Sequence, residues 1–298
     1  MIYIEAFQLP SSEKINDYIS NTNLTTYPWS IFLENGFEWI NCKEITIFYG
    51  NNGSGKSTLI NVLAEKISAQ RNNELFKDIV YGDYGAEIHP FDNFVQYVSV
   101  KMGYDDLGDP IIMPKVRKLI TSDDIFKRID ERSRHNRRTL MEIEQARNKH
   151  DEIIGKGYTY RNSDDYDNLV KLLEARRLSK RKYAEVHAKS KESMKSNGET
   201  AIEFYSRSFE TGGIYFLDEP ENCLSPLFQI ELIKLIQDAT RYFDCQFFIC
   251  THSPLLLSLS NAIIYNLDMR PVIRQKWEEL ENVRIYYDFF KQNKDKFE

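Results

Sequence analysis

The spacing of apolar residues changes along the chain, and each change predicts a different kind of structure. Residues 2–8 and 44–49 are short runs rich in β-branched and aromatic residues, which predicts two strands. Apolar residues at positions 59, 60, 62, 63 and 67 then recur with helical spacing, so a strand leads into a helix through residues 50–58. Residues 73–121 mix glycine, proline and aromatic residues with the strand-like pieces FVQYVSV and PIIMP, and we expect irregular structure there.

The middle of the chain, from about residue 124 to 195, is polar and has no proline. Its sparse apolar positions at 126, 129, 140 and 143 suit one long helix, and those at 169, 172, 173 and 186 suit a second. The segment GKGYTYRNSDD between them has turn chemistry. The pattern therefore predicts a helical hairpin inserted into the rest of the fold.

Strands and helices alternate again after the insert. Residues 213–218 and 245–250 are continuous apolar runs, as expected for central strands covered on both faces. Residues 225–240 begin with Ser-Pro and are strongly periodic, which predicts a helix. The pieces AIIYNL and PVIRQ are typical of late edge strands, and residues 277–298 favour a helix. We predict an α/β fold with a mixed, largely parallel sheet, built from residues 1–121 and 196–298 around a helical lobe at 122–195.

Composition and charge narrow the class of protein. The chain has 298 residues, 42% of them hydrophobic and 28% charged, which is ordinary for a globular protein. The apolar runs are shorter than a membrane helix requires and the N-terminus lacks a signal-peptide pattern, so we expect no membrane association. Four cysteines without a CxxC pair favour a reducing compartment, hence a cytoplasmic protein.

The formal net charge of −6 hides an uneven distribution. Residues 125–195 contain 19 Lys or Arg against 12 Asp or Glu, and the rest of the chain is correspondingly acidic. The basic runs RSRHNRR at 132–138 and KRK at 180–182 could follow nucleic-acid phosphates. A solvated helix surface and a docking surface for a partner protein are the alternatives.

Residues 50–58, GNNGSGKST, fit the phosphate-binding loop G-x-x-x-x-G-K-[ST]. Glycines let backbone N–H groups converge on a phosphate, and the following helix adds its positive N-terminal end. Lys56 would reach the β- and γ-phosphates, and the Ser57 hydroxyl would bind Mg²⁺. The candidate nucleotide-binding residues are Asn51, Asn52, Gly53, Ser54, Gly55, Lys56, Ser57 and Thr58. A plain Gly/Asn turn is the alternative, but the strand before and the helix after favour nucleotide binding.

Two carboxylates end the predicted strand IYFLD. Asp218 could hold Mg²⁺ through water, and Glu219 could orient and polarise a water for attack on the γ-phosphate. His252, in THSP after another strand, could hydrogen-bond the γ-phosphate. A solvated acidic turn and an ordinary surface or core histidine are the alternatives. Beside a phosphate-binding loop, the functional interpretations are favoured.

The segment KSNGET at 195–200 precedes a predicted helix. Ser196, Gly198 and the start of that helix form a further candidate anion site. Taken alone, Ser196 and Glu199 match the spacing of an ordinary capping box. The segment gains meaning only from its place 22 residues before Asp218.

With these four motifs in this order, the sequence resembles the ATP-binding-cassette (ABC) ATPases. It is most similar to the soluble branch related to the SMC and RecF proteins. Within that branch it resembles the short bacterial predicted ATPases, which include ATPase components of anti-phage defence systems. The resemblance covers roughly residues 1–70 and 195–298. The matching stretches are Gly50 to Thr58, Ser196–Glu199, Asp218–Glu221, Leu224–Pro226 and Thr251–Pro254.

The resemblance implies ATP and Mg²⁺ as cofactors and two protomers that enclose two ATP molecules head to tail. Ser196, Gly198 and Glu199 of one protomer would then lie at the γ-phosphate held by Lys56 of the other. Glu219 would be the catalytic carboxylate, aided by Lys56 and His252, and Ser225 would lie in a loop that crosses the interface.

Two departures from the family pattern stand out. Asn197 stands where glycine is the commonest residue of the signature. The residue that usually binds Mg²⁺ and water after the third strand is not evident, and Gln96 and the stretch Thr121–Asp124 are the candidates.

The resemblance favours an ATP-hydrolysing dimer switch in DNA maintenance or anti-phage defence, paired with an effector or nuclease. The alternatives are the nucleotide-binding subunit of a membrane transporter and an ATP-gated scaffold with little turnover. The glutamate-type signature, the charged insert and the DEPE/LSP combination make the transporter the less favoured of these.

Overall fold

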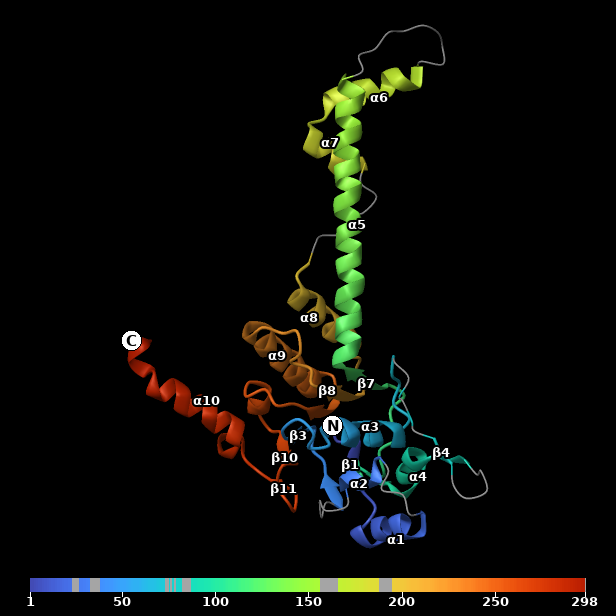
Figure 1. Cartoon of the computed structure of the whole chain (residues 1–298), viewed down its shortest axis with the longest axis vertical. Coiled ribbons are helices and arrows are strands. Elements are labelled where there is room, and N and C mark those ends of the chain that lie inside the picture. Colours follow the sequence, from blue (N-terminus) through green and yellow to red (C-terminus); the bar gives the residue numbers. More distant parts are fainter. Residues whose placement is uncertain are drawn as a thin grey trace. The chain divides into compact units, whose positions relative to one another are not determined.

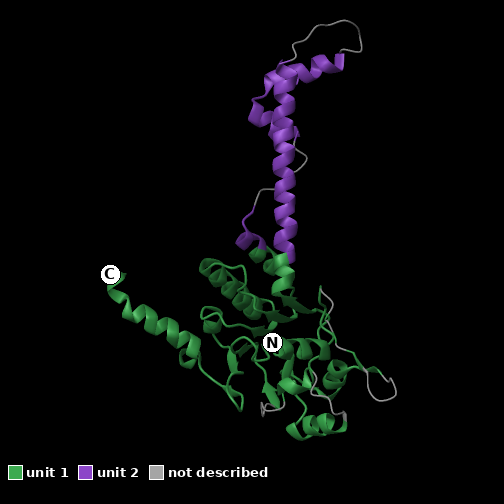
Figure 2. Ribbon diagram, in the orientation of Figure 1, with its two compact units in different colours: residues 1–126, 201–298 green, residues 127–200 purple. Residues whose placement is uncertain are grey.

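The computed structural model describes residues 1–22, 27–32, 38–72, 75, 77, 79–81, 87–155, 166–187 and 195–297. The chain forms two compact units (Figure 2), one made of residues 1–126 and 201–298 and the other of residues 127–200. Both ends of the chain therefore contribute to the first unit. The predicted domain limits at 121 and 195 stay a prediction.

The first unit contains a six-stranded sheet in the order β11-β10-β3-β9-β8-β7. Its strands are β3 (Ile45–Tyr49), β7 (Arg117–Thr121), β8 (Ile214–Asp218), β9 (Gln246–Cys250), β10 (Ile263–Asn266) and β11 (Ile273–Arg274). All neighbours pair in parallel except β10 and β11. The sheet is mixed and largely parallel, which confirms the predicted fold class. The runs at 213–218 and 245–250 are central strands, as expected.

Two predictions about this part of the sheet need correction. The piece AIIYNL forms β10, which lies between β11 and β3, so of the two predicted edge strands only β11 lies at an edge. Residues 73–121 are more regular than expected, because they supply the other edge strand, β7, as well as α4 (Pro90–Tyr97) and β6 (Ser99–Met102). Short β4 (Val80–Tyr81) and β5 (Glu87–Ile88) also pair there.

A second, antiparallel sheet has the order β2-β1-β6, with β1 at Ile4–Gln8 and β2 at Trp39–Asn41. Gln246 on β9 joins the two sheets through its fully buried amide. Its Oε1 accepts from the N–H groups of Tyr3 and Ile4 at 3.0 and 2.9 Å, and its Nε2 donates to the Ile4 carbonyl at 2.9 Å. The amide thus satisfies backbone groups that would otherwise be buried without partners.

Helices accompany the two sheets of the first unit (Figure 1). α3 (Lys56–Lys66) buries most of its residues, because it follows β3 directly into the core. The predicted helix at 225–240 is confirmed as α9 (Pro226–Tyr242), and the predicted C-terminal helix as α10 (Glu281–Gln292). The remaining helices are α1 (Ser12–Thr22), α2 (Trp29–Phe32), η3 (Leu256–Ser258), η4 (Trp277–Glu279) and η5 (Lys294–Lys296). No helix in the described part of the chain is long and apolar enough to cross a membrane.

The second unit is built on α5 (Ser122–Gly155), a helix of 34 residues that confirms the first predicted arm. The second arm is not one helix but two, α6 (Tyr166–Arg177) and α7 (Lys180–His187). The Ser179 hydroxyl accepts from the Lys182 N–H at 3.3 Å and so begins a new helix. α8 (Asn197–Ser208) follows. The predicted turn lies at 155–165, of which residues 156–165 fall outside the described residues.

Candidate nucleotide site

The loop at 50–58 joins β3 to α3, as the sequence predicts. Gly53 and Gly55 have φ angles of +85° and +92°, a left-handed conformation that favours glycine. At Gly50 a Cβ atom would lie 2.5 Å from the Ser54 hydroxyl, so a side chain there would collide. The conformation of the loop before α3 therefore favours glycine at all three glycine positions of the motif.

Lys56 is the first residue of α3, and its side chain is only 4% exposed. Its ammonium donates to the carbonyls of Gly50 and Asn51 at 2.8 and 3.1 Å. Nζ also lies 3.8 Å from Oε1 of Glu219. The positive charge is therefore held over the loop, where a phosphate could replace the carbonyl contacts. The Ser54 hydroxyl beside it is buried without a hydrogen-bond partner, which fits a loop that receives a polar ligand.

Ser57 and Asp218 form the candidate metal pair. The Ser57 hydroxyl donates to Oδ1 of Asp218 at 3.1 Å. Burial raises the pKa of Asp218 to about 6, the Ser57 hydrogen bond opposes that rise, and nearby Glu219 adds to it. Among the described residues no three His, Cys, Asp or Glu side chains cluster as metal ligands. One carboxylate and one hydroxyl are what Mg²⁺ commonly takes from a protein when phosphates supply its other ligands.

Glu219 lies between Lys56 and His252. Its backbone is left-handed, with φ at +47°, an uncommon conformation for a residue with a side chain. Oε1 lies 3.8 Å from Nζ of Lys56 and 3.7 Å from Nδ1 of His252, and Oε2 accepts from the Asn222 amide at 3.2 Å. Three of the predicted residues, from three separate motifs, therefore meet at the carboxyl edge of the sheet.

Glu221 is a further residue of this site that sequence reasoning missed. It is 7% exposed, and its Oε1 accepts from the Thr251 hydroxyl at 2.7 Å and from the N–H groups of His252 and Ser253 at 3.0 and 3.1 Å. Oε2 is buried without a hydrogen-bond partner. One carboxylate thus fixes the backbone that carries His252. The last glutamate of DEPE was the only signal of it in the sequence.

The same network continues to the turn at 224–226. The Ser253 hydroxyl donates to Oε1 of Gln229 at 2.6 Å, and Nε2 of Gln229 donates to the Leu224 carbonyl at 3.0 Å. The segment that carries His252 is therefore connected by hydrogen bonds to the turn that the resemblance places at a dimer interface.

Asp268, which follows β10, is another residue without a sequence signal. Both of its carboxylate oxygens accept from the Asn51 N–H at 2.9 Å. Asn51, Asn52 and Gly53 are exposed, whereas Thr58 is buried at 8% exposure. The loop therefore presents its tip to solvent and anchors its base in the core.

The remaining predicted site residues, Ser196, Gly198 and Glu199, belong to the second unit. The predicted capping box is confirmed: the Ser196 N–H donates to Oε2 of Glu199 at 2.7 Å, and the Glu199 N–H donates to Oγ of Ser196 at 3.2 Å. The hydrogen bonds from Ser196 lower the pKa of Glu199. The anion-binding role of these residues stays a prediction.

The two candidates for the missing Mg²⁺- and water-binding residue differ in position. Gln96 is exposed on α4, and its carbonyl accepts from Lys66 at 3.4 Å, at the end of α3 farthest from the loop. Eleven helical residues span roughly 16 Å. Thr121 instead pairs with Asp218 at the end of β7, and its N–H and hydroxyl both donate to Asp124. The geometry favours the stretch Thr121–Asp124.

One family model matches part of the chain. A family model described as "AAA domain, putative AbiEii toxin, Type IV TA system" matches residues 134–258. The match runs from the helical insert through Asp218 and Glu219 to His252 and does not reach the loop at 50–58. No curated protein matches the chain.

Several solved structures are similar in fold at low identity. The SMC head domain from Pyrococcus furiosus, with an extended coiled coil and bound to the C-terminal domain of ScpA, is 14% identical, with a TM-score of 0.39 over 97% of this chain and 100% of that chain. The SMC head domain from Thermotoga maritima is 10% identical, with a TM-score of 0.33 over 80% and 93%. An ATP-binding cassette in a dimeric post-hydrolysis state, bound to ADP and Pi, is 15% identical, with a TM-score of 0.34 over 81% and 90%. These likenesses are too distant to carry an argument about function.

The order of the sheet and the loop between β3 and α3 define an α/β fold of the P-loop type, and residues 134–258 match the AAA-domain family model. The family match supports this assignment independently of the phosphate-binding loop, because the matched residues begin beyond that loop.

Proposed function

We propose that the protein binds ATP with Mg²⁺ at the loop 50–58 and hydrolyses it to ADP and phosphate. The observation that carries the proposal is the convergence of Lys56 and His252 on Oε1 of Glu219, at 3.8 and 3.7 Å. A cation, a carboxylate and an imidazole around one point suit attack of water on a phosphoryl group.

Each residue has a distinct role in this proposal. Lys56 leaves its carbonyl partners and binds the β- and γ-phosphates. Glu219 accepts a hydrogen bond from the attacking water, whose oxygen bonds to the γ-phosphorus as the bond to the β–γ bridging oxygen breaks. His252 donates to the γ-phosphate. Ser57 and Asp218 would hold Mg²⁺, which neutralises phosphate charge when bound.

A second copy of the chain completes the site in this proposal. Ser196, Gly198 and Glu199 begin α8, where backbone N–H groups and the positive end of the helix suit an anion. The capping box of Ser196 and Glu199 supports the role, because it keeps the first turn in a fixed conformation. ATP then acts as the connection between two protomers.

The biological setting that fits best is a cytoplasmic switch that controls an effector or nuclease in DNA maintenance or anti-phage defence. The basic residues of the insert make DNA a candidate ligand. The name of the matched family, which refers to a putative toxin, supports a defence context.

Replacement of Glu219 by Gln tests the proposal. We expect the hydrolysis rate to fall roughly 100-fold or more, because an amide cannot accept the proton of the attacking water. In sedimentation velocity, ATP with Mg²⁺ should tighten the association of the chains relative to the nucleotide-free protein, and this ATP-dependent gain should persist in the variant. Glu231→Gln, an exposed position on α9, serves as the matched control and should hydrolyse like the wild type. Wild-type turnover in Glu219→Gln would remove the catalytic assignment, and ATP binding without turnover in the wild type would favour the scaffold.

A further inference from the structure

The C-terminal helix α10 (Figure 1) carries large apolar side chains that the described part of the chain leaves exposed. Ile285, Tyr286, Phe289 and Phe290 are 60%, 49%, 59% and 51% exposed. We call these four residues the α10 face. Soluble proteins rarely expose a contiguous patch of large apolar side chains without a binding partner for it.

The α10 face is one side of an amphipathic helix. At about 100° per residue its four members fall within an arc of roughly 140°. The charged residues Glu281, Arg284, Asp288 and Lys291 lie on the opposite side of the helix. Of the residues on α10, only Val283 is buried. The pattern is that of a helix that packs against a partner, yet the described residues of this chain cover little of it.

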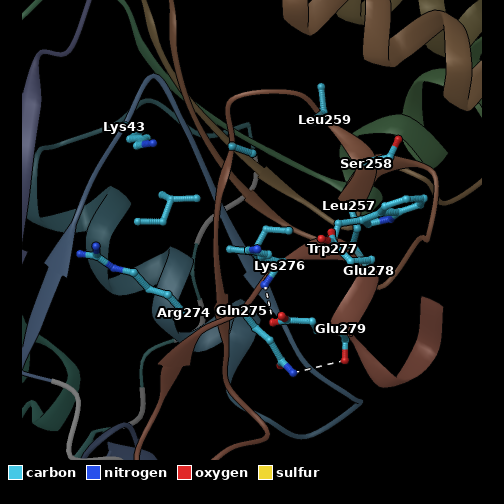
Figure 3. A pocket seen from close by; sticks show the side chains of 13 residues that line it. Lys43, Leu257, Ser258, Leu259, Arg274, Gln275, Lys276, Trp277, Glu278 and Glu279 are labelled. Carbon is cyan, nitrogen blue, oxygen red and sulfur yellow. Dashed lines mark hydrogen bonds between the residues drawn. The ribbon is translucent and has the colours of Figure 1, made fainter. Parts of the chain in front are cut away.

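The base of α10 is fixed, so the face is presented in a defined place. Leu280 is fully buried, the Asn282 N–H donates to the Tyr49 hydroxyl at 3.3 Å, and the Asn282 amide donates to the His252 carbonyl. Just before it, η4 lies beside an open cavity of about 490 Å³ (Figure 3), where Glu279 accepts from the Lys276 N–H and from the Gln275 amide. Trp277 Nε1 also donates to the Pro254 carbonyl at 2.9 Å. α10 is therefore a helix with an ordered start and an uncovered side.

The spacing of the α10 face suits a second copy of itself. Positions 285, 286, 289 and 290 read the same in both directions, since their intervals are one, three and one. An antiparallel pair related by a two-fold axis would set Ile285 opposite Phe290 and Tyr286 opposite Phe289. An isologous interface needs this kind of self-complementary pattern.

The charge of α10 and the exposed area of its apolar side chains also favour a second copy of the chain as the partner of the α10 face. α10 contains two acidic and two basic residues, so it lacks the positive charge with which interfacial helices bind anionic lipid. With Tyr287 at 52% and Phe297 at 72% exposure beside the face, the exposed area is roughly 600 Å² per copy, taking about 200 Å² for each large side chain. A stable interface buries about 800 Å² per partner, so most of that requirement is already present on this one helix.

We propose that α10 is the docking surface for α10 of a second copy, and that the two form an antiparallel pair that holds a dimer together without nucleotide. This contact is separate from the ATP-dependent contact proposed above, and it does not require hydrolysis.

The test uses the full chain without nucleotide and without Mg²⁺, in sedimentation velocity and equilibrium over a series of concentrations. We expect the wild type to be a dimer at micromolar concentration. Phe289→Glu should weaken the dimer about 30-fold or more, because it places a charge in the centre of an apolar interface. Lys291→Glu places the same acid on the opposite side of the same helix and should leave the dimer intact. Thermal unfolding followed at a dilution where every form is monomeric checks that the fold is kept.

The register gives a second measurement. In a Cys223→Ser background, Tyr286→Cys mixed with Phe289→Cys should form a disulfide between chains under mild oxidation, whereas Asp288→Cys mixed with Phe289→Cys should not. A monomeric wild type, or a Phe289→Glu variant that dimerises like the wild type, would overturn the proposal. A monomer that binds vesicles of phosphatidylcholine and phosphatidylglycerol would do so too and would assign the face to lipid. Loss of ATP hydrolysis in any variant bears on the nucleotide site and leaves this result unaffected.

Discussion

At the scale of single residues, burial makes ionisation of the Asp218 carboxyl group unfavourable. Burial raises its pKa from 3.8 to about 6. Between these two pH values the native state binds more protons than the unfolded state, so the free energy of unfolding falls as the pH rises. At neutral pH the ionised carboxylate therefore costs stability in the nucleotide-free protein.

Asp218→Asn should consequently stabilise the nucleotide-free protein at pH 7, by about 1–2 kcal/mol after allowance for the partial exposure of the carboxyl group. The gain should vanish near pH 3, below both pKa values, where the wild-type side chain is itself neutral in both states. Urea unfolding at the two pH values measures this. Asp238→Asn, an exposed aspartate on α9, should show no such difference between the two pH values. A variant less stable than the wild type at pH 7 would contradict the stated cause of the shift.

Glu221 should act through His252 rather than on the nucleotide, because its Oε1 holds the backbone of residues 251–253. We expect Glu221→Ala to lower kcat about 10- to 100-fold with little change in KM for ATP, since the phosphate-binding loop is untouched. Glu221→Gln keeps an acceptor oxygen for the same three donors and should restore most of kcat. Steady-state kinetics of the two variants decide this. Equal activity in the alanine variant and the wild type would show that other contacts suffice to hold His252.

At the scale of elements, predictability followed burial. β8 and β9 are covered on both faces, so all their positions except Asp218 and Gln246 are apolar, and the runs are plain in the sequence. β7, Arg117–Thr121, has partly exposed polar residues at its start and only two fully buried positions, which left no recognisable period. α4 was hidden for a different reason: FVQYV is rich in β-branched and aromatic residues, as strands are, and the buried Phe91, which lies three residues before Phe94 and reveals the helical spacing, precedes that stretch.

The break between α6 and α7 was also beyond the sequence pattern. No proline or glycine marks it, and Leu172 and Val186 fit a single helical period. Packing on α5 explains the break, because His150 bonds to the Ala175 carbonyl at 3.0 Å and its ring lies 5.1 Å from that of Tyr183. Two short helices can both contact one histidine where a single straight helix could not.

The joint between the two sheets gives a prediction at this scale. Gln246→Leu should lower the free energy of unfolding by about 2–4 kcal/mol, because it leaves the N–H groups of Tyr3 and Ile4 buried without an acceptor. Chemical denaturation measures the loss. Gln237→Leu removes one exposed hydrogen bond, to Ser260, and should cost less than about 1 kcal/mol. Equal losses in the two variants would mean that the buried amide does not join the sheets.

At the scale of the whole molecule, the sequence predicted those parts of the candidate site whose residues are close together along the chain. Lys56, for example, contacts the carbonyls of Gly50 and Asn51, which lie only six and five residues away along the chain. Glu221 and Asp268 could not be assigned roles, because their partners lie 31 and 217 residues away along the chain. Only the fold brings such residues together, and a single sequence does not show which distant residues become neighbours.

The charge of the insert gives a prediction that belongs to the molecule as a whole. We expect binding of double-stranded DNA at low salt, with an affinity that falls steeply as salt is added. Arg137 and Arg138 are exposed on α5, and replacing both by alanine should weaken binding and reduce the salt slope by about two. Arg241→Ala, in the acidic remainder of the chain, serves as the control. Binding that the double variant leaves unchanged would favour the insert as a surface for a partner protein.

The hydrogen bond from Asn282 to the His252 carbonyl has a consequence for how two chains would work together. If two chains pair through α10 as proposed, the pair would start beside the two candidate nucleotide sites, and the protomers would remain within reach of each other between rounds of ATP binding. Their engagement then becomes a unimolecular step with an effective concentration in the millimolar range. The proposed ATP-dependent contact would form at a rate independent of how dilute the protein is in the cell, and each turnover would open that contact without separating the two protomers.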